Sequence, residues 1–121
     1  MARFCFERFG ERLLADSSAG FDAFWLVYLR DHANRATRAA HYAGVAAAAA
    51  GTVGWVTSGH IPWLAAGLAA FLALVALGHG AIEKNRIFTL GRPLWTAAAC
   101  LRMAFCALVG RLDEDLRRAG L

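Results

Sequence analysis

The sequence predicts an all-α, small integral membrane protein with a hairpin of two spanning helices and further helices at the membrane interface. The first observation is a run from Ala39 to Ile82 without any Asp, Glu, Lys or Arg. The second is its single interruption at Thr57 to Pro62, where Gly and Pro supply turn chemistry that helix interiors avoid. The third is a composition with 59% hydrophobic and 18% charged residues. A soluble bundle with two buried helices is the alternative, but so short a chain has little surface to cover them.

The chain divides into three expected segments: an N-terminal amphipathic segment (1–20), a membrane domain (21–111) and a charged C-terminal tail (112–121). The first segment alternates aromatic and charged residues, so it does not have the apolar core of a cleavable signal. It is expected to be an interfacial helix, or else a helix that packs on the others.

The membrane domain begins with an aromatic segment, Phe21 to Leu29, which is expected to form a short helix. Trp25 and Tyr28 suit the headgroup level of a bilayer, where such rings are enriched. The next helix is expected to start near Asn34, a good N-cap, and to continue into the first span.

Two spans follow, Ala39 to Val56 and about Pro62 to Ile82. Each is close to the roughly 20 residues that cross a bilayer core. Basic residues flank the outer ends of both spans and the turn has none, so the positive-inside rule places both ends of the hairpin in the cytoplasm. The membrane would be the inner or plasma membrane of a bacterium, or the endoplasmic reticulum of a eukaryote.

The formal net charge of +4 agrees with contacts to lipid headgroups and predicts no nucleic acid partner. A third apolar segment, Leu94 to Val109, contains Arg102 near its middle. An arginine at a bilayer centre costs about 3 kcal/mol on insertion scales, so an interfacial helix is favoured and a third span is left open. The three cysteines have no disulfide or metal-site spacing and are expected as reduced thiols. A homo-oligomer is also left open, on the small-residue faces of the spans: Gly44, Ala48, Gly51 and Gly67.

Three histidines and a carboxylate are expected at one membrane boundary. His41 begins the first span, while His79 and Glu83 share a helical face at the end of the second. His32 lies nine residues before His41, about 180° away on a continuous helix, so the chain must bend near Asn34 for the two to meet. Each residue alone has an ordinary explanation as a headgroup or helix-end contact. Together they predict a metal site, for which imidazole suits iron, zinc and copper alike. His60, in the turn, is expected to be only a loop residue.

Two blocks of the sequence resemble a known family. Phe24 to Asn34 and Arg38 to Gly44 follow the pattern F-[FYW]-x-x-Y-L-x-x-H-x-N, then R-x-x-H-x-x-G. Gly78 to Arg86 and Pro93 to Trp95 resemble the G-H-x-x-[IF]-E-K-N-[RK] and P-L-[WY] segments. These patterns are similar to the Mpo-like 2-hydroxy fatty acid dioxygenases. Ile87, Phe88 and Cys100 depart from the family pattern.

The resemblance implies an Fe(II)-dependent membrane enzyme that uses O2 to shorten 2-hydroxy fatty acids by one carbon. It implies His32, His41 and His79 as iron ligands, with Glu83 as a further ligand or a partner of one. Three basic residues near the site are expected to bind either the substrate carboxylate or, equally, lipid headgroups: Arg38, Lys84 and Arg86. Two other classes are kept open, a bis-histidine haem protein with axial His41 and His79 and a non-enzymatic membrane hairpin.

Overall fold

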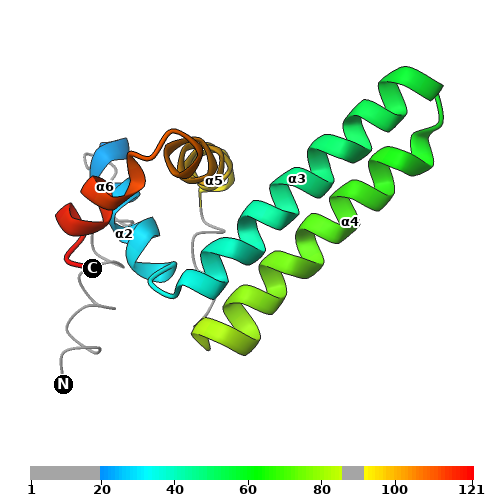
Figure 1. Cartoon of the computed structure of the whole chain (residues 1–121). Helices are drawn as coiled ribbons and strands as arrows, with labels where there is room; N and C mark the ends of the chain where they lie inside the picture. Colours follow the sequence, from blue (N-terminus) through cyan, green and yellow to red (C-terminus); the bar gives the residue numbers. More distant parts are fainter. Residues whose placement is uncertain (1–19, 86–91) are drawn as a thin grey trace.

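The computed structural model describes residues 20–85 and 92–121. The expected N-terminal amphipathic segment lies outside the described residues except for Gly20, and so does Arg86. The described part of the chain is helical and contains no strand, which confirms the all-α class. Its elements are the helices α2 (Phe21–Asp31), α3 (Arg35–Ser58), α4 (Ile61–Leu77), the π-helix η1 (Gly78–Glu83), α5 (Pro93–Leu108) and α6 (Leu112–Arg118) (Figure 1).

Helices α3 and α4 form a long antiparallel hairpin that extends away from the other helices (Figure 1). As predicted, Asn34 is the N-cap of α3, and its side chain accepts a hydrogen bond from the Ala36 N–H at 2.8 Å. At the far end, Gly59 adopts a left-handed φ of 72°, which ends α3. Exposed His60 is the N-cap of α4, and Pro62 lies in the first turn, where its missing N–H costs nothing. The predicted turn is confirmed.

Glycines let the two hairpin helices pack closely. A Cβ atom on Gly51 would lie 2.5 Å from the Trp63 carbonyl oxygen, and one on Gly67 would lie 2.7 Å from the Ala47 carbonyl oxygen. The small-residue face expected for a homo-oligomer is therefore used inside the hairpin, so it gives no support for association between chains.

One described helix is long and apolar enough to cross a membrane. It is the continuous α4 and η1, Ile61–Glu83, of whose most apolar stretch only 11% is buried. A core helix of a soluble protein would be mostly covered. Helix α3 is long enough as well, but it is rich in Ala and Gly and does not reach the same hydropathy. Large apolar side chains on both helices are exposed, namely Val53, Val56, Ile61, Trp63 and Leu72.

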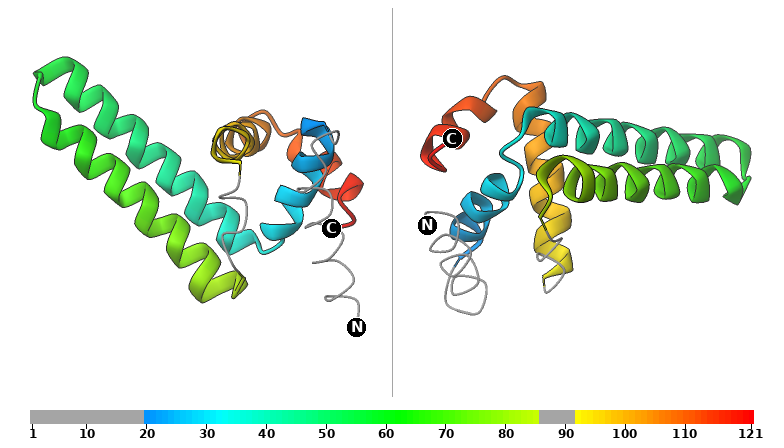
Figure 2. Two further views of the ribbon diagram at one scale, coloured as in Figure 1. Left: turned by 180° about the vertical axis from the view of Figure 1, so that it is seen from behind. Right: turned by 90° about the horizontal axis from the view of Figure 1, so that it is seen from below.

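The remaining helices form a small head at the base of the hairpin (Figure 2). Aromatic residues of α2 make its core together with α5, namely Phe24, Trp25, Tyr28, Ala99, Cys100 and Met103. Trp25 and Tyr28, expected at the headgroup level of a bilayer, are 0% and 1% exposed, so their rings pack inside the head and do not face lipid, while their depth in a bilayer stays a prediction. Both aromatic rings pack in the core between α2 and the neighbouring helices α5 and α6. The charged C-terminal segment forms α6, which packs on α2, and its Leu112 is buried in the same core.

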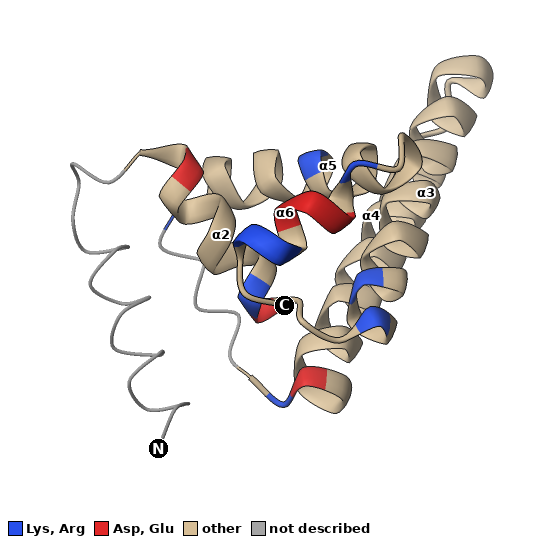
Figure 3. Cartoon of the chain, turned by 60° about the vertical axis from the view of Figure 1, so that its left-hand side comes forward, with Lys and Arg blue, Asp and Glu red and all other residues tan. Residues whose placement is uncertain are grey.

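Helix α5 runs across the hairpin, since Figure 1 views it nearly end-on while α3 and α4 lie in side view. Its Arg102 contacts Asp22 at 3.3 Å and Asp115 at 3.7 Å, and its guanidinium lies 4.6 Å from the centre of the Trp25 ring. Described charged residues gather on the head and at the base of the hairpin, and the outer part of the hairpin has none (Figure 3). Arg102 is therefore partnered within the head.

Candidate metal centre

Three buried imidazoles meet at the base of the hairpin. His32, His41 and His79 are 1%, 2% and 4% exposed. One nitrogen of each lies within 4.8 Å of the others, and the Nε2 atoms of His32 and His41 are 3.1 Å apart. The structure therefore brings together the three histidines that the sequence proposed, and this group could hold a metal ion.

The bend between α2 and α3 makes this meeting possible. Helix α2 ends at Asp31, and His32 leaves the helical conformation with φ −118° and ψ 37°. Helix α3 restarts at Arg35 in a new direction (Figure 1). The His32 ring stacks on that of Tyr28 with centroids 4.1 Å apart, which orients it toward α3.

His79 lies in the π-helix that follows α4. Such wide turns are uncommon and often occur at functional sites. The π-helix ends at Lys84, which adopts a left-handed φ of 53°. The carboxylate of Glu83, the last residue of the π-helix, accepts a hydrogen bond from the Asn34 N–H at 2.6 Å. Glu83 is not one of the residues whose ligand atoms converge within 4.8 Å.

Hydrogen bonds fix which nitrogen of each ring has the proton. Nδ1 of His32 lies 2.6 Å from the Tyr28 carbonyl oxygen, and Nδ1 of His41 lies 2.9 Å from that of Thr37. A carbonyl only accepts, so both Nδ1 atoms are protonated.

The proton of the third imidazole is fixed through Asn85. The side-chain amide of Asn85 donates from Nδ2 to the Asp31 carbonyl at 3.0 Å, which leaves its Oδ1 to accept from His79 Nδ1 at 2.8 Å. All three Nε2 atoms are therefore left with lone pairs.

Three Nε2 lone pairs that lie this close together can bind a cation. Burial, aided by the neighbouring His41, lowers the pKa of His32 from 6.5 to about 3, so a proton is not held between the rings at neutral pH. For a metal–nitrogen distance of about 2.1 Å, adjacent ligand nitrogens lie about 3.0 to 3.4 Å apart. The 3.1 Å separation of the His32 and His41 Nε2 atoms falls in this range. Metal-binding histidines ordinarily donate their other ring N–H to a carbonyl or carboxylate oxygen, as Nδ1 does here in all three rings.

An apolar pocket of about 270 Å³ opens beside the imidazoles. Besides the three histidines, its walls come from α2, α4 and α5 and include Tyr28, Phe71, Leu72, Val75, Ala97 and Cys100. Leu72 is 64% exposed, so the pocket reaches the outer surface of α4. An alkyl chain can therefore lie against the candidate span while its polar end reaches the histidines.

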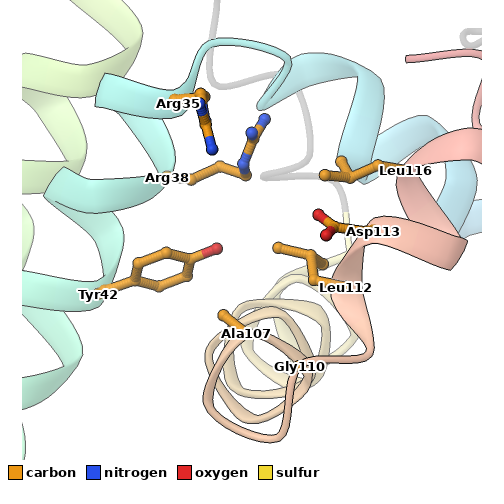
Figure 4. Close-up of a pocket in the computed structure, with 8 residues that line it drawn as sticks. All are labelled: Arg35, Arg38, Tyr42, Ala107, Gly110, Leu112, Asp113 and Leu116. Atoms are coloured by element: carbon orange, nitrogen blue, oxygen red, sulfur yellow. The ribbon is translucent and has the colours of Figure 1, made fainter.

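A second, polar cavity of about 240 Å³ lies between α3 and α6 (Figure 4). Its lining includes Arg35, Arg38 and Tyr42 from α3 and Asp113 from α6. Arg38, expected to bind a substrate carboxylate, lines this cavity and is not among the lining residues of the histidine pocket. Its guanidinium instead donates to main-chain carbonyls of the α2–α3 bend. Of the other two basic residues, Lys84 is exposed and Arg86 lies outside the described residues.

Sequence reasoning missed two residues that touch the imidazoles. Tyr28 was assigned to the membrane interface, although its carbonyl and ring both hold His32. Asn85 had no role, although it bonds His79 directly. Tyr28 belongs to the first motif block and Asn85 to the second. The motifs therefore include both residues, but they do not indicate that Tyr28 contacts His32 or that Asn85 contacts His79.

The comparisons with known proteins agree with this site. A family model described as 2-hydroxy-palmitic acid dioxygenase Mpo1-like matches residues 18–112. No curated protein and no solved structure matches the chain. The matched region contains the three histidines and both helices of the hairpin.

Proposed function

The chain belongs to the Mpo1-like family, described as 2-hydroxy-palmitic acid dioxygenase, and from this membership we propose that it is a membrane-bound, Fe(II)-dependent enzyme. Its reaction would use O2 to shorten 2-hydroxy fatty acids by one carbon. The observation that supports this proposal most directly is the set of three Nε2 lone pairs converging in a buried site.

In this proposal His32, His41 and His79 hold the iron. Three imidazoles leave open coordination positions, and an iron bound there would supply a site for the polar end of the substrate and for O2. The chain itself orients the imidazoles by their Nδ1–H bonds, and burial keeps His32 neutral. It excludes water with Phe71, Leu72 and Val75, which would contact the alkyl chain.

The haem alternative is not favoured. Axial imidazoles of a bis-histidine haem lie on opposite faces of a planar macrocycle. Here all three imidazoles converge on one point, with ring centroids separated by 4.4 to 5.2 Å.

A membrane position suits both the substrate and the exposed surface. We propose that the hairpin inserts in the bilayer with both of its ends cytoplasmic, and that the head lies at the headgroup level. The pocket would then receive the alkyl chain sideways from the lipid, along the exposed Leu72 side of α4. The charged residues at the hairpin base agree with this depth.

The test is anaerobic reconstitution of the detergent-purified full chain with Fe(II), followed by 2-hydroxypalmitate and O2. Mass spectrometry should detect the acid shorter by one carbon. The product should disappear in His79→Ala and persist in His60→Ala, since His60 lies at the opposite end of the hairpin. Iron binding without product would reject the substrate class, and wild-type protein that binds no iron would reject the metal centre.

A further inference from the structure

The α2–α3 link is the segment Asp31–Asn34. The main chain of each of its four residues makes a hydrogen bond with a side chain from outside the link. Arg38 Nη1 donates to the His32 and Ala33 carbonyls at 2.8 and 2.7 Å. The remaining bonds are Asn85 Nδ2 to the Asp31 carbonyl and the Asn34 N–H to Glu83, at 3.0 and 2.6 Å.

These bonds satisfy groups that the end of a helix leaves without partners. The Asp31 carbonyl at the end of α2 has no intrahelical donor, and water has little access to the His32 carbonyl, since His32 is 1% and Arg38 8% exposed. The two N–H groups of one guanidinium nitrogen are enough for the His32 and Ala33 carbonyls, which follow the end of α2. Its positive charge also lies at the negative end of the α2 dipole.

The link determines where His32 lies relative to the other two imidazoles. A continuous helix would place His32 and His41 on opposite faces, so their 3.1 Å approach depends on the bend keeping its shape. Asn85 connects the two sides of the site, because it binds the His79 ring through one atom of its amide and the link through the other.

We infer that Arg38, Glu83 and Asn85 form a clamp on the α2–α3 link that sets the position of His32 against His41 and His79. They are positioning residues, and this assignment replaces substrate binding for Arg38 and metal ligation for Glu83. The inference rests on the proposed metal centre. It goes further in assigning the geometry of that centre to three side chains that do not reach the metal.

The experiment titrates Co(II) into the metal-free full chain in detergent and records both the dissociation constant and the visible absorption spectrum, which reports ligand geometry. Replacing partners of metal-binding histidines ordinarily weakens affinity by about 10- to 100-fold. Arg38→Met, Asn85→Ala and Glu83→Ala should each weaken Co(II) binding by this amount and alter the spectrum. The matched control is Arg35→Met, because exposed Arg35 lies on the same helix without a hydrogen bond to the described link.

Glu83→Gln separates a clamp from a ligand. Glutamine keeps an oxygen to accept from the Asn34 N–H, so binding and spectrum should stay close to wild type while Glu83→Ala loses affinity. If Glu83→Gln weakens Co(II) binding as much as Glu83→Ala does, Glu83 is a ligand and the clamp is wrong. This comparison stays decisive even if Arg38→Met does not fold. Unchanged affinity in Arg38→Met, Asn85→Ala and Glu83→Ala would also overturn the clamp and leave the metal centre intact. Failure of the wild type to bind Co(II) would instead reject the centre itself.

Discussion

At the scale of single residues, each imidazole of the candidate centre is committed to one tautomer. A backbone carbonyl or an amide oxygen accepts the Nδ1–H of each ring, so Nε2 is the free ligand atom in all three. Neutral imidazole is the form that binds metals, and burial keeps His32 neutral by lowering its pKa to about 3. His32 therefore needs no proton release to bind a metal at neutral pH.

Metal binding should stabilise the folded chain through these residues. At a free concentration about 100 times the dissociation constant, Fe(II) or Co(II) adds about 2.7 kcal/mol to the free energy of unfolding. Anaerobic thermal unfolding should show this increase for the wild type and for His60→Ala. His32→Ala, His41→Ala and His79→Ala should show none, and elemental analysis should find no bound metal in them. Equal losses in all four variants would contradict the assignment of the site.

The sequence predicted the three histidines as a site because ionisable residues at the end of an apolar span often have a functional role. This signal can be read from one sequence. The sequence could not predict the partners of these histidines, because a contact such as His79 with Asn85 depends on the π-helix between them. In a regular α-helix, His79 and Glu83 would share a face. In the π-helix that forms here, Glu83 bonds the Asn34 N–H at the start of α3.

At the scale of elements, the hairpin depends on helices that approach through glycine. The predicted helix start at Asn34 and the turn at Gly59 have local sequence signals, and both are confirmed. The pairing of Gly51 with Gly67 has no comparable signal. The same small residues would serve equally well between two chains, which is why the sequence left an oligomer open.

Gly51→Ala should destabilise the hairpin. The new Cβ atom would lie 2.5 Å from the Trp63 carbonyl oxygen and 2.9 Å from the Gly67 Cα, so the helix backbones must separate. Overpacking of this kind costs about 1 to 3 kcal/mol. Thermal unfolding followed by circular dichroism should report the loss. Gly80→Ala is the control, since its Cβ atom meets nothing within 4 Å. Equal melting temperatures for the two variants would contradict the packing argument.

Helix α5 presents an exposed apolar stripe. Leu94, Leu101, Phe105 and Leu108 are 83%, 62%, 62% and 86% exposed. At 100° per residue they fall on one face, opposite the side that packs on α2 and α3. This pattern is typical of a helix that lies in a membrane interface.

A spin label at Phe105→Cys, in protein without its native cysteines and reconstituted in lipid, should be relaxed by O2 and protected from a water-soluble nickel complex. A label at Glu114→Cys on α6, which is exposed among charged residues, should respond in the opposite way. Nickel access to the first label equal to that of the second would place α5 in water.

At the scale of the whole molecule, the described charged residues lie toward one end. The outer part of the hairpin has no charged residue, whereas the head and the hairpin base have the described ones (Figure 3). The sequence showed this division directly. It could not show that the head packs α2, α5 and α6 around buried Trp25 and Tyr28, because aromatic residues suit a core and an interface equally.

The proposed orientation predicts the side from which the hairpin turn can be labelled. A membrane-impermeant maleimide should label Ser58→Cys only from the non-cytoplasmic side, and Gly120→Cys only from the cytoplasmic side. Both positions are exposed, so the labelling side and not burial decides the result. Labelling of Ser58→Cys from the cytoplasmic side would overturn the hairpin orientation.

The histidine pocket is lined by residues up to His41 on α3 and from Phe71 onward on α4, so residues 42–70 do not line it. The outer hairpin can therefore gain or lose matching turns from its two arms without displacing a ligand. For the proposed membrane insertion, membranes of different thickness would require changes only in a part of the chain that does not line the pocket. Descendants of one ancestral gene could adapt to such membranes by small paired insertions or deletions near Gly59, while the chemistry stayed as it was.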